Sequence, residues 1–416
     1  MTKSTSVVDR PAGMSPGLTL LFAVAGGAAV GNLYWAQPLL GNIAAALGVP
    51  PGTAGLLVTL TQVGYALGVF LVVPLGDTLN RKRIIPAIMV LCSVSLAGSA
   101  VAPNFDVLLV ALALVGVTTV AGQLLTPLAG DLASDEQRGR VVGTVVSGLL
   151  TGILVSRTVS GIVADLFGWR VVYFAASAVV LLLAVVLARA LPDLAPRDHV
   201  PYGRLLHSVL AAVSRHRPVR IILVLGAALM CVFTAFWTGL TFMLAAAPFS
   251  FTASQIGLVG LVGVFGAIAA QRTGRVYDRG RAVPAIGAGL AITLVSLAVS
   301  GLGATSIVAV LTAVALLSIG IQSAQVLLQT KMLSLDPAAR SRLNTALVVG
   351  NFIGGAAGSA LAGVLWQVGG WAAIMSGAAL IVAVAWRCGS STEKAPSGAT
   401  RLARADDGSC GCRGRS

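Results

Sequence analysis

Charge is scarce in this sequence. Asp, Glu, Lys and Arg make up only 10% of its 416 residues, whereas soluble proteins carry about 25%. Hydrophobic residues make up 56% of the chain, and runs of ~20 apolar residues span a bilayer as helices. This composition excludes a soluble globular protein. It predicts an all-α polytopic membrane protein whose first partner is the lipid bilayer.

Titratable side chains that could act in catalysis are also rare at membrane depth. The three histidines all lie between residues 191 and 218, and no acid lies clearly within an apolar run. A membrane-embedded enzyme, the most distant alternative, needs a buried catalytic constellation of such groups, so we expect no enzyme. The five cysteines form no ligand set for a metal. The glycine-rich runs lack the Lys of a phosphate-binding loop, so no cofactor is expected.

Apolar runs separated by charged or Pro/Gly breaks predict twelve membrane spans. One long hydrophilic interruption, rich in Pro and Arg, divides the spans into six and six. We therefore expect five regions along the chain. These are a cytoplasmic N-terminal segment (1–16), an N-terminal six-helix bundle (17–190), a cytoplasmic central loop (191–218), a C-terminal six-helix bundle (219–387) and a disordered cytoplasmic tail (388–416).

The net charge of +14 is distributed unevenly along the chain. On a soluble protein such a charge would suggest a nucleic-acid partner. Here 26 of the 28 Lys and Arg residues lie in one alternating set of loops between the spans. The positive-inside rule places those loops, and with them both termini, in the cytoplasm. We therefore expect a plasma-membrane protein that has no nucleic-acid partner.

The two sets of six spans are copies of one another at an offset of about two hundred residues. The pairs Arg138 and Arg340, Gly152 and Gly354, Gly168 and Gly370, and Trp169 and Trp371 are each 202 residues apart. Matching Arg and Trp residues at one offset indicates a repeat rather than a coincidence of glycines. Two parallel six-helix repeats are a transporter architecture, in which the substrate site lies near the bilayer midplane between rocking halves.

A tight, charged turn follows the second span. Its Asp77 and Arg81 are one helical turn apart and can form an ion pair. The turn recurs about two hundred residues later, which favours a gating latch that is paired in one conformer and open in the other. The predicted latch residues are Asp77, Arg81 and Lys82 in the first half and Asp278, Arg279 and Arg281 in the second. The alternative is a positive-inside turn with an incidental acid.

The fifth span combines small residues with one charge. Close helix packing is predicted for the face made by Gly148, Gly152, Ser156, Ser160 and Gly161. Arg157 is the only cation inside a predicted span. A charge at membrane depth costs at least ~2.5 kcal/mol, so Arg157 is expected to face the protein interior or a water-filled cavity, where it attracts an anionic group or a carboxylate. The alternative is an arginine that snorkels to the membrane surface.

Other polar and aromatic groups at membrane depth are candidates for substrate or coupling-ion contacts. Together with Arg157 they are Asn32, Tyr34, Gln37, Gln123, Asp131, Trp237, Gln325 and Asn351. Any one of them is also explained by hydrogen bonding between helices. As a set spread over several spans they predict a mixed polar cavity. The titratable group for proton coupling stays open among Asp77, Asp131 and Asp165.

The chain resembles the major facilitator superfamily (MFS) over nearly its whole length, through its twelve spans, its six-plus-six halves and its basic central loop. Its charged turn is similar to the superfamily's signature loop at Asp77, Arg81 and Lys82, and departs from it at Val73, Thr78 and Asn80. The fifth span resembles that of the superfamily's drug/proton antiporters, with Ser156-Arg157 in the place of a central Gly-Pro pair.

This resemblance implies a bacterial inner-membrane secondary transporter with the MFS fold, which works as a monomer by alternating access. The implied activity is efflux of small amphipathic compounds or drugs by an antiporter, as in multidrug resistance. Protons as the coupling ion follow from the resemblance alone. A second hypothesis rests on Arg157: the small-molecule substrate is an organic anion or a sugar that contacts this side chain.

Overall fold

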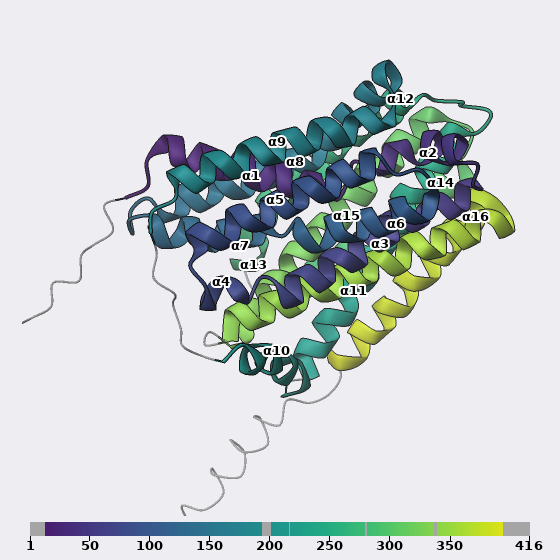
Figure 1. Cartoon of the computed structure of the whole chain (residues 1–416). Coiled ribbons are helices and arrows are strands. Elements are labelled where there is room, and N and C mark those ends of the chain that lie inside the picture. Colours follow the sequence, from purple (N-terminus) through teal and green to yellow (C-terminus); the bar gives the residue numbers. More distant parts are fainter. Residues whose placement is uncertain (1–12, 194–200, 216, 279–280, 337–338, 394–416) are drawn as a thin grey trace, which may run out of the picture.

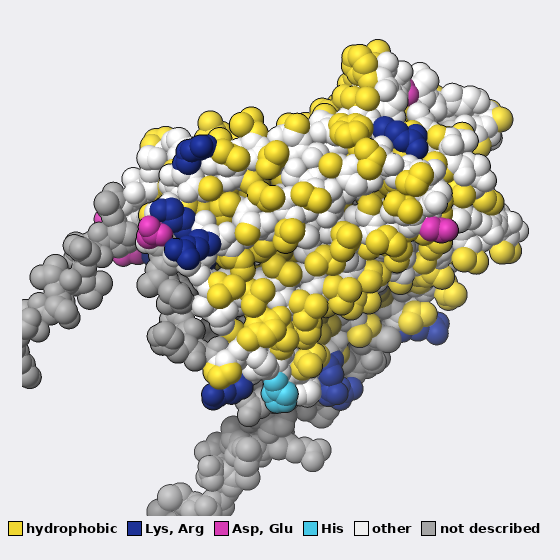
Figure 2. All heavy atoms as spheres, in the orientation of Figure 1, with side chains coloured by type: hydrophobic (Ala, Val, Ile, Leu, Met, Phe, Trp, Pro, Cys, Tyr) yellow, Lys and Arg dark blue, Asp and Glu magenta, His cyan; other side chains and the backbone are white. Residues whose placement is uncertain are grey.

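A computed structural model describes residues 13–193, 201–215, 217–278, 281–336 and 339–393 (Figure 1). Ten helices within these ranges are long and apolar enough to cross a membrane. Figure 2 shows hydrophobic side chains covering the middle of one face of the bundle, with charged side chains toward its two ends. The predicted all-α polytopic fold is confirmed.

The N-terminal half begins with an interrupted helix. The chain leaves helical geometry after Gly31 and resumes as a short 3-10 turn containing Pro38, whose nitrogen has no hydrogen to donate. The first predicted span is therefore made of three short elements rather than one helix. The elements of this half are α1 (Pro16–Gly31), η1 (Gln37–Leu39), α2 (Leu40–Leu47), α3 (Pro51–Leu71), α4 (Leu75–Thr78), α5 (Arg81–Ala100), α6 (Phe105–Thr118), α7 (Ala121–Leu132), α8 (Arg138–Phe167) and α9 (Trp169–Ala190).

The C-terminal half follows a helix that occupies the predicted central loop. Its elements, with that helix first, are α10 (Tyr202–Arg215), α11 (Arg217–Ala245), α12 (Ala253–Val259), η2 (Gly260–Gly263), α13 (Val264–Asp278), α14 (Ala282–Leu302), α15 (Ile307–Leu335) and α16 (Arg340–Glu393). The last of these contains two crossings, because Gly369 and Gly370 have non-helical dihedral angles. Every one of the twelve predicted spans thus has a helical counterpart.

One boundary differs from the expected one. Helix α16 continues to Glu393, so residues 388–393 are helical instead of belonging to a disordered tail. No proline interrupts the helix in that stretch, and the first proline after it is Pro396. The remainder of the predicted tail, residues 394–416, lies outside the described residues.

The sequence repeat reappears in backbone geometry and in helix packing. Gly168 and Gly370 both have positive φ, 88° and 59°, a region that side chains disfavour. Each residue ends the penultimate span of its half. Within the first half a Cβ on Gly152 would overlap the backbone of Gly27 on α1, and within the second half a Cβ on Gly354 would overlap the backbone of Ala227 on α11. Small residues therefore set the same close helix approach in both halves.

The rest of the predicted small-residue face of α8 continues this contact. A Cβ on Gly148 would overlap the backbone of Ala23 on α1. Ser156 lies beside Gly31 at the end of α1, and Ser160 is fully buried. Gly148 and Ser156 therefore hold α8 against the first span.

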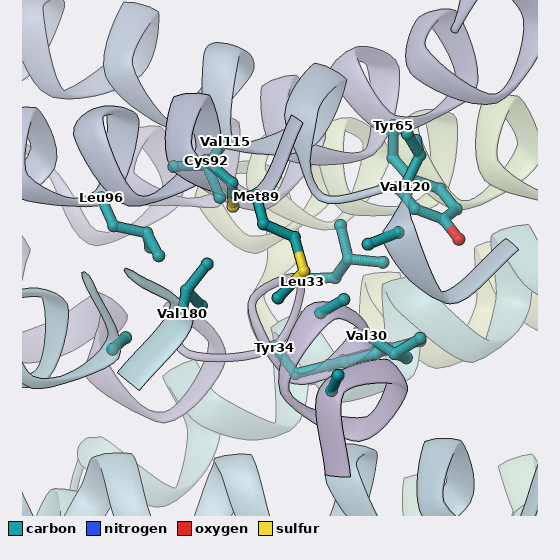
Figure 3. Close-up of a cluster of buried hydrophobic side chains, with 14 of the residues drawn as sticks. Val30, Leu33, Tyr34, Tyr65, Met89, Cys92, Leu96, Val115, Val120 and Val180 are labelled. Atoms are coloured by element: carbon teal, nitrogen blue, oxygen red, sulfur yellow. The ribbon is translucent and has the colours of Figure 1, made fainter. Parts of the chain in front are cut away.

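Each half forms most of one hydrophobic core, and the first core also includes Phe242 and Ala253 of the C-terminal half. Figure 3 shows part of the first core, in which Met89 and Cys92 of α5 lie among side chains from α1, α3, α6 and α9. The second core is built mainly from α11, α14, α15 and α16. Because each core is built mainly within one half, each half can move as one body while the contacts between the halves change.

Two matching glycine contacts join the halves. A Cβ on Gly161 of α8 would overlap the backbone of Ala253 at the start of α12. In the repeat-related position, a Cβ on Gly363 of α16 would overlap the backbone of Gly52 at the start of α3. The absence of a side chain at both positions lets the backbones of the two halves touch.

The glycine contacts lie at the same end of the bundle. There Asp165 Oδ2 also accepts a hydrogen bond from the Ser254 N–H at 2.8 Å, across the two halves. We call this the closed end. The opposite end, which we call the basic end, carries Arg81, Arg138, Arg217 and Lys331 at helix termini.

Candidate functional site

Arg157 lies on α8 at the junction of the two halves. Its side chain is enclosed rather than extended to the membrane surface, with the residue only 3% exposed. Two interrupted helices flank it. Gln37 of η1 comes from the first half, and a Cβ on Gly260 of η2, from the second half, would lie 3.3 Å from Arg157 Cδ. Broken helices around a site near the midplane are a recurrent feature of transporters.

Three aromatic rings surround the guanidinium group. Arg157 Cζ lies 4.2 Å from the ring centroid of Trp237, 4.8 Å from that of Tyr34 and 5.8 Å from that of Phe233. Tyr34 belongs to the first half, whereas the other two rings stand on one face of α11. Each such cation–π contact contributes about 0.5–2 kcal/mol. We call Arg157, Gln37 and the three rings the arginine cage.

The arginine cage contains hydrogen-bond donors that lack acceptors. Arg157 Nε donates to Gln37 Oε1 at 2.8 Å. Among the described residues, no carboxylate forms an ion pair with Arg157. Arg157 Nη2, Gln37 Nε2 and Trp237 Nε1 are buried without a hydrogen-bond partner. Leaving a buried donor unpaired costs about 1–3 kcal/mol, and more for a charged group. The cage therefore suits a ligand that brings negative charge and several acceptors.

Three predicted candidates form hydrogen bonds between the helices of a single half. Gln123 Nε2 donates to Tyr65 Oη at 3.0 Å. Asn351 Nδ2 donates to Gln325 Oε1 at 3.3 Å, and Gln325 Nε2 donates to a backbone carbonyl of α11 at 3.0 Å. None of the three has a contact with Arg157 among the interactions of the described residues. The Oδ1 atom of Asn351 is buried and unpaired, so this group has unused capacity to accept.

Asn32 is occupied by contacts within the first half. Its Nδ2 donates to Thr119 Oγ1 at 3.1 Å, and its Oδ1 accepts a hydrogen bond from Trp35 Nε1 at 2.8 Å. The side chain thereby ties the interrupted first span to the fourth. Both functional groups of its amide are used, which leaves Asn32 a packing role in this conformation.

Phe233 is a residue of the arginine cage that the sequence analysis missed. It is buried and lies four residues before Trp237, so the two rings share a helix face. The four-residue spacing between Phe233 and Trp237 was the signal in the sequence that could have identified it. A lone Phe in an apolar span carries no other mark of function, because membrane helices are rich in such residues.

Arg81 is the centre of an ion-pair cluster at the basic end. Its Nη2 lies 2.9 Å from Asp77 Oδ1, its Nη1 lies 2.8 Å from Asp131 Oδ2, and its Nε donates to the Gly76 carbonyl at 2.8 Å. All of these residues belong to the first half. The structure places Asp131 in this cluster rather than in the arginine cage, because α7 carries it to the basic end. We call Asp77, Arg81 and Asp131 the first latch.

The remaining predicted latch residues differ in their surroundings. Lys82 Nζ lies 3.1 Å from Asp193 Oδ2, and this hydrogen bond and charge hold the pKa of the exposed Asp193 below its ordinary value. Of the second latch, the side chain of Asp278 and all of Arg279 lie outside the described residues. Arg281 is exposed where α14 begins.

Two six-helix halves that repeat one another around an enclosed site define a membrane transporter of the alternating-access class. The chain belongs to the Major Facilitator Superfamily, whose family model matches residues 21–339. It is 38% identical to the Escherichia coli O157:H7 protein named uncharacterized transporter YgaY, over 89% of this chain and 94% of the relative. It is 22% identical to the inner membrane transport protein YnfM of Escherichia coli K12, over 63% of each chain.

A solved structure shares the fold. It is the bacterial homolog of the human lysosomal transporter Spinster in an inward-facing, unoccupied conformation, with a TM-score of 0.73 at 15% identity, over 91% of this chain and 97% of that chain. The family makes the chain a multi-pass MFS secondary transporter of a small molecule, and not an enzyme. The names of these relatives specify neither drug antiport nor a coupling ion.

Proposed function

We propose that this transporter carries a small organic anion with an aromatic or other apolar body, bound at the arginine cage. One observation carries the proposal: Arg157 is enclosed, has no described carboxylate partner, and adjoins unpaired donors on Gln37 and Trp237. An anion supplies the missing negative charge and the missing acceptors together. The rings of Tyr34, Phe233 and Trp237 offer apolar walls for the rest of the molecule.

The positive charge of Arg157 favours an organic anion over a cation or a neutral sugar as the substrate. A cation is repelled by Arg157 in a site of low dielectric. A neutral sugar can accept hydrogen bonds but leaves the charge uncompensated. The predicted efflux of amphipathic compounds fits the aromatic walls when the compound carries an anionic group. We keep proton exchange as the coupling hypothesis, and its support is the resemblance of the fifth span to that of drug/proton antiporters.

We further infer that the protein lies in a bacterial inner membrane with both termini in the cytoplasm. The support is the excess of Lys and Arg in the loops at the basic end. The glycine contacts and the Asp165–Ser254 hydrogen bond at the closed end then separate the arginine cage from the periplasm.

Binding of three ligands that differ only in charge tests the substrate class. The purified protein is titrated with benzoate, benzamide and benzylamine, and binding is followed by isothermal titration calorimetry. We expect benzoate to bind at least tenfold more tightly than the other two, because only it pairs with Arg157. Arg157→Gln should abolish this preference. The matched control is Arg170→Gln, since Arg170 also stacks on a ring, that of Trp169 at 4.3 Å, but lies outside the cage. Equal binding of the three ligands would contradict the proposal.

Transport into proteoliposomes tests the coupling hypothesis separately. Benzoate flux is measured with and without an imposed pH gradient, at equal membrane potential. Proton exchange predicts accumulation that follows the gradient. Flux that is indifferent to pH, with benzoate still bound, would remove proton coupling and leave the organic-anion assignment in place.

A further inference from the structure

The C-terminal half has a second hollow, at the basic end and separate from the arginine cage. A groove of ≈ 970 Å³ runs between α11 and α14, with the end of α15 behind it and Trp386 of α16 at its side. Its walls are apolar and include Ile221, Leu225, Ile286 and Leu290. No residue of the arginine cage lines it. The groove is therefore a candidate binding site distinct from the arginine cage.

Two cations stand at one end of this groove. Arg217 is the first residue of α11, and Lys331 lies four residues before Leu335, the last residue of α15. Neither side chain has an ion pair or a hydrogen bond with another described residue, and none of the described residues that line the groove is acidic. An apolar groove whose two cations have no counter-ion among the described residues matches an amphiphile with an anionic head.

The depth of the groove matches one leaflet of a bilayer. Its lining runs from Arg217 to Leu225 on α11 and from Val283 to Ala291 on α14, which is nine residues, or eight steps, along each helix. At 1.5 Å per residue both walls are ~12 Å deep, close to half of the ~30 Å hydrocarbon core. Val283 and Trp386 are 41% and 37% exposed, so the groove opens on the flank of the bundle. Trp favours the level of lipid headgroups.

We propose that this groove is a binding site for an anionic phospholipid of the leaflet at the basic end. The phosphate lies between Arg217 and Lys331, and the acyl chains follow the apolar walls of α11 and α14. Because α11 also carries Phe233 and Trp237 of the arginine cage, the bound lipid contacts a helix that forms the transport site. The lipid site does not depend on the identity of the transported substrate.

Native mass spectrometry of the purified protein tests the role of the charges. Phosphatidylglycerol and phosphatidylcholine with the same acyl chains are added in equal amounts, and the retained lipids are counted. We expect preferential retention of phosphatidylglycerol, and at least a tenfold loss of it in the double variant Arg217→Gln, Lys331→Gln. The matched control is Arg140→Gln, Arg189→Gln, which removes two cations from the ends of α8 and α9 outside the groove. Equal retention of both lipids, or equal loss in both double variants, would overturn the proposal.

A substitution that fills the groove tests its apolar part without changing charge. A Cβ on Gly287 of α14 meets no atom within 4 Å, and Gly287 lines the groove. The Phe side chain of Gly287→Phe starts in open space and should therefore fill the groove and displace the lipid. The matched control is Gly98→Phe on α5, where a Cβ also meets no atom within 4 Å. Thermal unfolding in detergent verifies that both variants fold. Undiminished phosphatidylglycerol retention by Gly287→Phe would show that the lipid binds elsewhere and would refute the site.

Discussion

Two buried arginines of this protein stand in opposite electrostatic surroundings. Arg81 is 8% exposed and is paired with Asp77 and Asp131, with a backbone carbonyl accepting from its Nε. Arg157 is 3% exposed, and its described partners are one amide oxygen and three aromatic rings. The first is neutralised within its own half. The second receives contacts from both halves and keeps an unpaired Nη2.

This difference in charge compensation indicates different roles for Arg81 and Arg157. A buried ion pair is maintained by its partners, and removing one of them leaves an uncompensated charge. A buried cation without a counter-ion is held in place only by the surrounding fold. Its charge therefore stays free to pair with a ligand. Arg81 therefore belongs to the structure and gating of the first half, whereas Arg157 belongs to substrate binding between the halves.

The largest expected effect is that of Arg157→Gln on transport. Removing the charge from the arginine cage should lower the transport rate of an organic anion at least about 100-fold, since the loss of a buried charge contact costs about 2–5 kcal/mol. Thermal stability without substrate should not fall, because the variant no longer buries an uncompensated charge. Proteoliposome flux and thermal unfolding in detergent measure the two properties.

The same substitution at the other buried arginine, Arg81→Gln, completes the comparison of the two side chains. It should lower the melting temperature, because Asp77 and Asp131 lose their shared cation. The contrast between the two arginines would be lost if Arg157→Gln destabilised the protein as much as Arg81→Gln does.

Asp77→Asn should weaken the first latch without preventing membrane insertion. A hydrogen bond to a charged group contributes about 1.5–3 kcal/mol, and the 39% exposure of the Asp77 side chain reduces that contribution. We expect the ratio of conformers, and with it the transport rate, to change about tenfold. Flux in proteoliposomes is compared with the amount of inserted protein. Normal flux would leave the turn as an ordinary positive-inside loop.

Trp237→Phe separates the hydrogen-bond donor of the cage from its aromatic ring. The variant keeps a ring over Arg157 and loses the unpaired Nε1, so affinity for the anion should fall about five- to tenfold, the equivalent of one hydrogen bond. The control is Trp371→Phe, because Trp371 Nε1 donates to the Ser300 carbonyl inside the second core. That variant should lose stability and keep its affinity. Calorimetric titration with benzoate and thermal unfolding distinguish the two outcomes.

The smallest effect is expected for Lys82→Ala at the surface. Lys82 holds the pKa of Asp193 below its ordinary value, so the pair stabilises the fold above the unfolded-state pKa of about 3.9 and ceases to do so as pH falls through the lower folded-state value. The melting temperatures of the wild type and the variant should therefore differ slightly near neutral pH and converge in acid. The control is Arg189→Ala, which should show no such convergence.

The membrane class, the helical fold and the repeat could be predicted from the sequence because they depend on local composition and on its periodicity. Gly152 and Gly354 mark equivalent packing positions whose spacing is visible in the chain itself. The burial of Arg157 was an expectation from the cost of a charge in lipid. Phe233 was missed because it differs from other apolar residues only through its neighbours.

The sequence by itself determined that a charge must be enclosed somewhere in the fifth span, and that Asp77 and Arg81 are close enough to pair. Only the tertiary structure decided which groups surround each charge. It brought Asp131 to Arg81 and left Arg157 with aromatic rings and unpaired donors. The physical reason is that the cost of burying a charge is a property of the residue, whereas its compensation depends on side chains that are distant in the chain.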